Sequence, residues 1–137
     1  LVSHIASVKH RFLSLVALGV AANRCGLELV EGQRTFRNYS NRQTPCDHAM
    51  RVVGDVNALD RGVKAKQADG GTEYELLYDS YGGGNGLIRH TQNQHGPLNR
   101  LITYYEEEAA LAQFQSEGWM VERTELQDGT VELVGCR

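Results

Sequence analysis

The stretch from residue 73 to residue 120 constrains the fold of this chain more than any other part. It combines a strand pattern at Glu73–Asp79, a glycine-rich loop at residues 81–86 and a long helix pattern at Leu98–Glu117. The strand alternates apolar and polar side chains, whereas the helix repeats apolar side chains at helical spacing. A helix with one apolar stripe needs a sheet or a second helix to cover that stripe. We therefore expect the rest of the chain to complete a sheet for this helix to lie on.

The predicted long helix has clear limits and one clear face. Pro97 suits its start and Gly118 suits its end. The apolar side chains that share its stripe are Leu98, Ile102, Tyr105, Ala109 and Ala112. Consecutive helical residues fan out by about 100° each, so Glu106, Glu107 and Glu108 cannot converge on one reactive centre. We expect Glu106 and Glu107 to lie on the solvated side.

Two hairpins flank this helix pattern. The first joins Val63–Ala68 to Thr72–Asp79 through Asp69–Gly71, whose residue types supply the positive φ angles of tight hairpin turns. The second is expected after the helix, from Trp119–Leu126 to Thr130–Gly135. Antiparallel pairing of neighbouring strands is therefore expected on both sides of the helix.

The N-terminal part begins with a strand pattern and a capped helix. Ser3–Phe12 alternates as a strand does. A helix is expected over Leu15–Cys25, with Ser14 as its N-cap and Gly26 as the left-handed residue that ends it. Cys25 falls on the apolar stripe of this helix, so we interpret it as a small core residue and not as a nucleophile.

Further strands complete the sheet. Leu27–Arg37 reads as a strand that Gly32 interrupts, and His48–Val53 reads as a short strand. The polar segment Asn38–Asp47 between them is expected to be an exposed loop. The predicted order is therefore strand, helix, three or four strands, helix and two strands.

This order predicts an α+β fold. We expect one domain over residues 1–137, built as a two-layer sandwich with a mainly antiparallel sheet of about five to seven strands and two helices on one face, in the order β-α-β-β-β-β-α-β-β. The apolar fraction of 41% and charged fraction of 23% are those of an ordinary globular protein. Side chains such as Ile5 and Leu77 would point to the other sheet face, where they leave room for a partner or a second copy.

The glycine-rich loop does not match a nucleotide site. No Gly-Lys-Ser/Thr ending follows it, and Arg89 stands where the dinucleotide pattern needs glycine or alanine. A phosphate loop should also open directly into a helix, but the polar segment Leu87–Gly96 intervenes. We therefore expect no nucleotide cofactor and interpret the glycines as a turned or flexible connection.

Metal binding and catalysis lack a compelling spacing. His90 and His95 are five residues apart in an expected loop, and Cys46-Asp47-His48 would point alternately to opposite faces of a strand. We assign no catalytic, cofactor-binding or metal-binding residue. The three cysteines form no CxxC pair and are odd in number, which favours reduced thiols in a cytoplasmic compartment. No apolar run is long enough for a membrane span, so no membrane association is expected.

The charge distribution leaves two interpretations open. Residues 1–68 hold ten Lys and Arg against five Asp and Glu, a net charge of +5, and residues 69–137 hold four against twelve, a net charge of −8. A basic face could bind nucleic acid, and the residues that would do so are Arg34, Arg37, Arg42, Lys64 and Lys66. The pI of 5.9 does not favour this alternative. The interpretation we prefer is that the two halves interleave and mix their charges in space.

Several short motifs carry a resemblance to a known family. They are Ser3–Ala6, Asp60–Lys64, Tyr74–Asp79 with its following glycines, Val121–Glu125 and Asp128–Leu133. Together they resemble the domain-of-unknown-function 1257 family of small bacterial, phage and plastid-encoded proteins. The resemblance implies no established activity, cofactor or catalytic residue. Because members of that family tend to be encoded near AAA-type ATPases, it implies an accessory or adaptor role.

We therefore expect a non-enzymatic binding or adaptor subunit of a larger or self-associating assembly, with a protein partner or a second copy. The contacts are expected near the loop at residues 82–96, and the candidate residues are Asp79, Tyr81, Asn85, Arg89, His90 and His95. Nucleic-acid binding is the first alternative. The second is a small enzyme with its site in the same loop, which would require these side chains to meet in one pocket.

Overall fold

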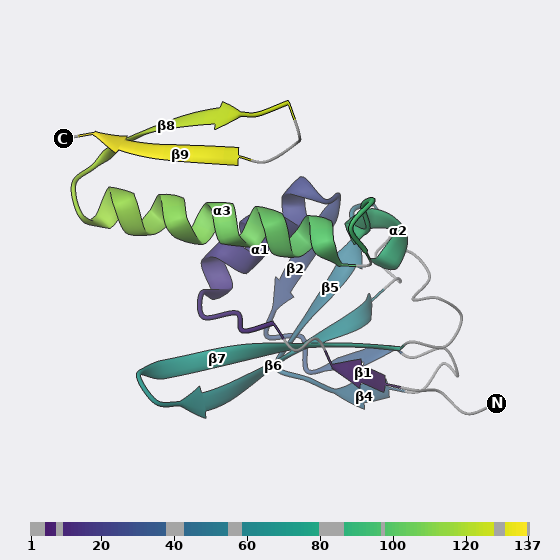
Figure 1. Ribbon diagram of the computed structural model, residues 1–137. Coiled ribbons are helices and arrows are strands. Elements are labelled where there is room, and N and C mark those ends of the chain that lie inside the picture. The colour runs from purple at the N-terminus through teal and green to yellow at the C-terminus, as the bar shows by residue number, and fades with distance from the viewer. Residues whose placement is uncertain are drawn as a thin grey trace.

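A computed structural model describes residues 5–7, 10–37, 43–54, 59–79, 87–96, 98–127 and 131–136. Its centre is a five-stranded antiparallel sheet, shown in Figure 1. In spatial order the strands are β1 (Ile5–Ser7), β7 (Gly71–Asp79), β6 (Leu59–Ala68), β5 (His48–Val52) and β2 (Leu27–Glu31). The hairpin of β6 and β7 turns at Asp69–Gly70, as the sequence predicts, with Gly70 at a φ of 91°. β2 lies at one edge of this sheet.

Within the described ranges, three helices accompany the sheet: α1 (Leu15–Arg24), α2 (Leu87–Thr91) and α3 (Asn99–Ser116). α1 begins as predicted, because the Ser14 hydroxyl accepts a hydrogen bond from the Ala17 amide at 3.1 Å. Gly26 ends the turn after it at a φ of 80°. α1 and α3 pack on each other and lie on the same side of the sheet (Figure 1).

The main core lies between these helices and the sheet. Its sheet side is formed by Leu27, Met50, Val63 and Leu76, and its helix side by Ala17, Leu18, Ala21, Ala22, Leu101 and Tyr105. The Tyr105 hydroxyl accepts hydrogen bonds from the amides of Leu13 at 2.7 Å and Ser14 at 3.1 Å. The start of α1 is thereby fixed to α3, while the ring of Tyr105 stays buried beside Phe12.

A two-stranded ribbon covers part of the opposite sheet face. It consists of β3 (Thr35–Arg37) and β4 (Gln43–Pro45). β4 lies inside the segment that the sequence suggested as an exposed loop, so that expectation was wrong. The ribbon buries Phe36 in a second small core with Cys46, Ala49 and Leu77. Leu77 packs against this second core. The sequence left this side chain on the outer sheet face with room for a partner, but the chain itself covers part of that face.

The last two strands, β8 (Met120–Glu125) and β9 (Val131–Cys136), form a separate antiparallel ribbon. This ribbon packs on α3, on the side that faces away from the main sheet (Figure 1). The predicted α+β class with antiparallel strands is confirmed. The differences in detail are α2 and β4, which the sequence pattern missed, and the placement of β8 and β9 outside the main sheet.

Candidate interaction surface

Of the six contact residues predicted near the glycine-rich loop, the structure describes the side chains of Arg89, His90 and His95. Asp79 ends β7, where it pairs with Ile5 across the strands. Tyr81 and Asn85 lie outside the described residues, as does the side chain of Asp79. No site can therefore be assembled around these three residues.

The other three candidates of this loop differ in burial. Arg89 and His95 are exposed, and His95 Nε2 lies 3.3 Å from Gln94 Nε2. His90 is half-buried against the turn between α1 and β2, since a Cβ added at Gly26 would lie 3.4 Å from His90 Nδ1. Within the described ranges, no group of three or more His, Cys, Asp or Glu side chains could hold a metal ion. His90 therefore packs against Gly26, in the turn that connects α1 to β2.

The basic residues proposed for nucleic acid are partly neutralised by carboxylates. Arg34 pairs with Asp47 at 3.2 Å, and Lys66 pairs with Glu75 at 2.8 Å. Arg37 and Lys64 are exposed. The remaining candidate, Arg42, is outside the described residues. Two of the four described candidates, Arg34 and Lys66, are therefore already paired with carboxylates.

Ion pairs also connect the basic first half of the chain to its acidic second half. His10 Nε2 lies 2.7 Å from Glu106 Oε1, Arg24 Nη1 lies 2.9 Å from Glu108 Oε1, and Arg11 pairs with Glu73. These pairs agree with the interpretation that the two halves interleave and mix their charges.

Glu107 corrects an expectation about α3. The sequence placed it on the solvated side, but its side chain is only 7% exposed and pairs with Arg24 of α1 at 3.3 Å and with Arg123 of β8. Burial raises the pKa of the Glu107 carboxyl, but the hydrogen bond from Arg123 and the charge of Arg24 outweigh burial and hold the pKa below its ordinary value. The carboxylate of Glu107 on α3 therefore has a structural role, because its ion pairs connect α3 to α1 and to β8.

The most unusual surface of the described chain is the outer side of α1. The first eight residues of this helix carry no polar side chain. Val16 is 78% exposed and Val20 is 40% exposed, one helical turn apart on the side that faces away from the core. A helix that is apolar all round is normally covered on all sides. The outer side of α1 is therefore an apolar helix face that the described part of the chain leaves exposed.

Among the described strands, β2 is paired on one side only, and its other edge lies beside this helix face. The amide of Val53 donates to the carbonyl of Gly26 at 3.1 Å, which makes these two residues a hydrogen-bonded pair. Hydrogen-bonded and non-bonded pairs alternate along antiparallel strands. The backbone groups of Leu27, Leu29 and Glu31 therefore point away from β5, toward the open edge of the sheet.

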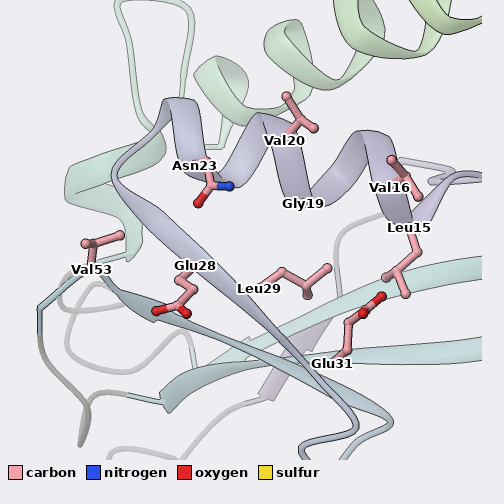
Figure 2. Close-up of a pocket in the computed structure, with 9 residues that line it drawn as sticks. All are labelled: Leu15, Val16, Gly19, Val20, Asn23, Glu28, Leu29, Glu31 and Val53. Carbon is pink, nitrogen blue, oxygen red and sulfur yellow. The ribbon is translucent and has the colours of Figure 1, made fainter.

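A groove of about 620 Å³ runs between this edge and α1. Its lining residues, drawn in Figure 2, are Leu15, Val16, Gly19, Val20, Asn23, Glu28, Leu29, Glu31 and Val53. Leu29 extends beneath Gly19, where an added Cβ would lie 3.4 Å from Leu29 Cδ2. Glu28 is paired with Arg51 at 2.9 Å, whereas Glu31 is exposed at the groove's end. The α1–β2 groove is thus lined by a mixture of apolar side chains, such as Val16, Val20 and Leu29, and polar ones, which are Asn23, Glu28 and Glu31.

A second hollow, of about 470 Å³, lies between α3 and the β8–β9 ribbon. Its lining includes Ile102, Phe114 and Leu133, together with Glu106 and Glu107, which are already held in ion pairs. This hollow is the seam along which the ribbon packs on α3. We therefore favour the α1–β2 groove as the interaction surface.

The sequence could have indicated this surface only in part. The absence of polar side chains from the start of the first predicted helix was visible in the sequence. That β2 lies at an edge was not, because its place follows from the pairing order of distant strands. The two features together make the surface distinctive.

Comparison with family models, with curated proteins and with solved structures found no match. The resemblance to the domain-of-unknown-function 1257 family therefore stays a prediction. Among the helices in the described part of the chain, none has the length and apolar character needed to span a membrane.

Proposed function

We propose that this protein is a non-enzymatic binding module, an adaptor subunit that takes up a strand of a protein partner along the α1–β2 groove. The observation that carries the proposal is the edge of β2 that no described strand pairs, beside exposed Val16 and Val20. An extended partner strand would satisfy the outward backbone groups of Leu29 and Glu31. Its alternate side chains would fill the groove above Leu29.

Two further features support a binding role. Natural edge strands are usually protected by charged side chains, proline or a bulge. On β2 the outward backbone positions are occupied by Leu27, Leu29 and Glu31, of which one is charged, and the β-bulge of the sheet lies between β5 and β6 instead. An adaptor role is also what the family resemblance implies.

Two of the three described thiols, Cys25 and Cys46, are poorly suited to nucleophilic catalysis, whereas Cys136 is exposed. Burial raises the pKa of the Cys25 thiol to about 11, and burial followed by the charge of Asp47 raises the pKa of Cys46. A thiol with a raised pKa is mostly protonated at neutral pH and is a poor nucleophile. The Glu107 carboxylate, whose pKa is lowered, is held in ion pairs with Arg24 and Arg123.

Selection from a displayed library of random peptides tests the proposal. Peptides enriched on the intact protein are then measured against two variants of one edge residue. Glu31→Pro removes the outward amide, and Glu31→Ala keeps it, while both remove the carboxylate. Because the Glu31 amide does not face β5, both variants should fold.

We expect selected peptides to bind the wild type and Glu31→Ala with similar affinity and to bind Glu31→Pro at least tenfold more weakly. Equal binding to both variants would contradict strand addition at this edge, as would a library that yields no binder.

A further inference from the structure

We infer that the occupant of the α1–β2 groove is a second copy of this chain, which pairs its β2 antiparallel with the first β2 across a two-fold axis at Leu29. This inference rests on the proposed function and names its partner. The result would be one continuous sheet that joins the two five-stranded sheets edge to edge. Both groups of helices would lie on the same face of that joined sheet, because the axis is perpendicular to it.

The backbone geometry of β2 permits this pairing. A two-fold axis through Leu29 places Leu29 opposite Leu29 of the second copy, and Leu27 opposite Glu31. All three residues point their backbone groups to the open edge, as the Val53–Gly26 hydrogen bond requires. Outward residues therefore meet outward residues, and each such pair can exchange two hydrogen bonds.

The charges of the edge are compatible with a second copy. Glu31 would face the apolar Leu27, and Glu28 would face the apolar Val30. Glu28 is also neutralised by Arg51 at 2.9 Å. No like charges are directly opposed across the strands, which is the arrangement that destabilises a strand pair. The small net charge of −3 adds little repulsion between two copies.

A second copy would also cover an apolar surface of α1 that a single added strand leaves exposed. A single added strand would lie along β2, but Val16 is 78% exposed on the outer side of α1. A second copy brings its own α1 to the same side of the joined sheet. The exposed residues of this helix, Val16 and Val20, carry no charge. Two such helices can therefore pack on each other across the axis.

The expected dimer is weak. The groove is lined by nine residues, fewer than the roughly 20–30 residues a side of a standard stable interface. We therefore expect a dissociation constant on the order of micromolar and an exchange between monomer and dimer in solution.

Sedimentation velocity of the full chain, from about 1 μM to several hundred μM, tests the inference. The wild type should shift with concentration from 15.2 kDa toward twice that mass. The dimers of Val20→Glu and Glu31→Pro should dissociate at least tenfold more readily, so both variants should stay mostly monomeric over this concentration range. Val134→Glu is the matched control, since Val134 is 42% exposed on β9, close to the 40% of Val20. This control should dimerise as the wild type does.

The register is tested by cross-linking in a Cys136→Ser background, which removes the exposed thiol. Residues opposite each other as a hydrogen-bonded pair have Cα atoms about 5.5 Å apart, within the range a disulfide spans. Leu29→Cys should therefore form a disulfide dimer when copper-phenanthroline and oxygen accept the two electrons. Val30→Cys should not, because Val30 would face Glu28 of the second copy.

A wild type that stays monomeric throughout would overturn the inference. So would a dimer that Val134→Glu dissolves as strongly as Val20→Glu does, or a dimer in which Leu29→Cys fails to cross-link. A monomeric chain that still binds selected peptides through the Glu31 amide would overturn self-pairing and leave the proposed function standing.

Discussion

The guanidinium of Arg24 on α1 donates a hydrogen bond to the buried carboxylate of Glu107 on α3, with 3.3 Å between Nη2 and Oε2. Arg123 of β8 donates to the other carboxylate oxygen. Arg24 also stacks on the ring of Tyr104, with its Cζ 4.0 Å from the ring centroid. One carboxylate thus ties the first helix, the last helix and the C-terminal ribbon together.

Replacing this carboxylate should destabilise the fold. We expect Glu107→Gln to lower the free energy of unfolding by about 1–3 kcal/mol, because it removes a buried charge that pairs with both Arg24 and Arg123. Urea denaturation followed by circular dichroism measures the change. Glu106→Gln is the control, since Glu106 is exposed and its loss should cost less than about 1 kcal/mol. Equal losses in the two variants would contradict the role of Glu107.

The same site predicts a dependence of stability on pH. The pKa of Glu107 in the folded state lies below its ordinary value of 4.5. Its contribution is therefore complete above the unfolded pKa and is lost as the pH falls through the folded pKa. As the pH falls from about 5 through the folded pKa, the stability difference between wild type and Glu107→Gln should shrink toward zero. A difference that stays constant over this window would contradict the assignment.

The close approach of Gly62 to Phe36 predicts a further effect on stability. A Cβ added at Gly62 would lie 2.7 Å from Phe36 Cε1 and 2.9 Å from Cys46 Cβ, so Gly62→Ala should cost about 1–3 kcal/mol in unfolding free energy. Gly19→Ala is a control with the opposite sign. Its Cβ would make an ordinary contact at 3.4 Å within a helix, so it should stabilise by about 0.5–1 kcal/mol. The two variants are compared by thermal unfolding, and a shift of the same sign in both would contradict the packing.

The three cysteines should differ in reactivity. Cys136 is exposed, whereas Cys25 and Cys46 are buried, and burial raises the pKa of Cys25 to about 11. Near pH 8, Ellman's reagent should label one thiol rapidly and the other two only after unfolding. The variant Cys136→Ser should show no rapid phase. Rapid labelling of two or more thiols in the folded wild type would be inconsistent with this core.

The C-terminal ribbon has a built-in reporter. Trp119 is the chain's single tryptophan, and its ring contacts Phe114 of α3 with centroids 6.4 Å apart. A Cβ at Gly135 would lie 3.1 Å from the Trp119 ring and 3.2 Å from Phe114. Gly135→Val should therefore loosen the ribbon and shift the fluorescence of Trp119 to longer wavelength, while far-ultraviolet circular dichroism changes little. An unchanged emission spectrum would argue against this packing.

Much of the fold could be predicted because its signals are local. Ser14 and Gly26 mark the ends of α1 by capping chemistry, and Asp69–Gly70 marks the β6–β7 turn by its φ angles. The hairpin pattern of β8 and β9 was equally clear. It could not reveal where the ribbon lies, since alternation shows that a strand has a buried face without naming what covers it.

The rest depended on contacts between distant residues. Helical spacing predicted that Glu107 lies on the solvated side of α3. In the structure β8 packs beside α3, and Arg123, sixteen residues after Glu107, donates a hydrogen bond to its carboxylate. The candidate surface depends on the order β6-β5-β2, which leaves β2 at the edge although β3 and β4 follow it in sequence. Local patterns do not carry that information, and the sequence therefore directed attention to the glycine-rich loop instead.

Amide hydrogen exchange along β2, measured by NMR at two protein concentrations, tests the central claim most directly. In dilute protein, the inward amides of Glu28 and Val30 should exchange slowly and the outward amides of Leu29 and Glu31 rapidly. At high concentration, or with a selected peptide, Leu29 and Glu31 should become protected by at least tenfold. Strong protection of Leu29 and Glu31 in the most dilute sample would contradict the account, because the edge of β2 would then be closed within the chain itself.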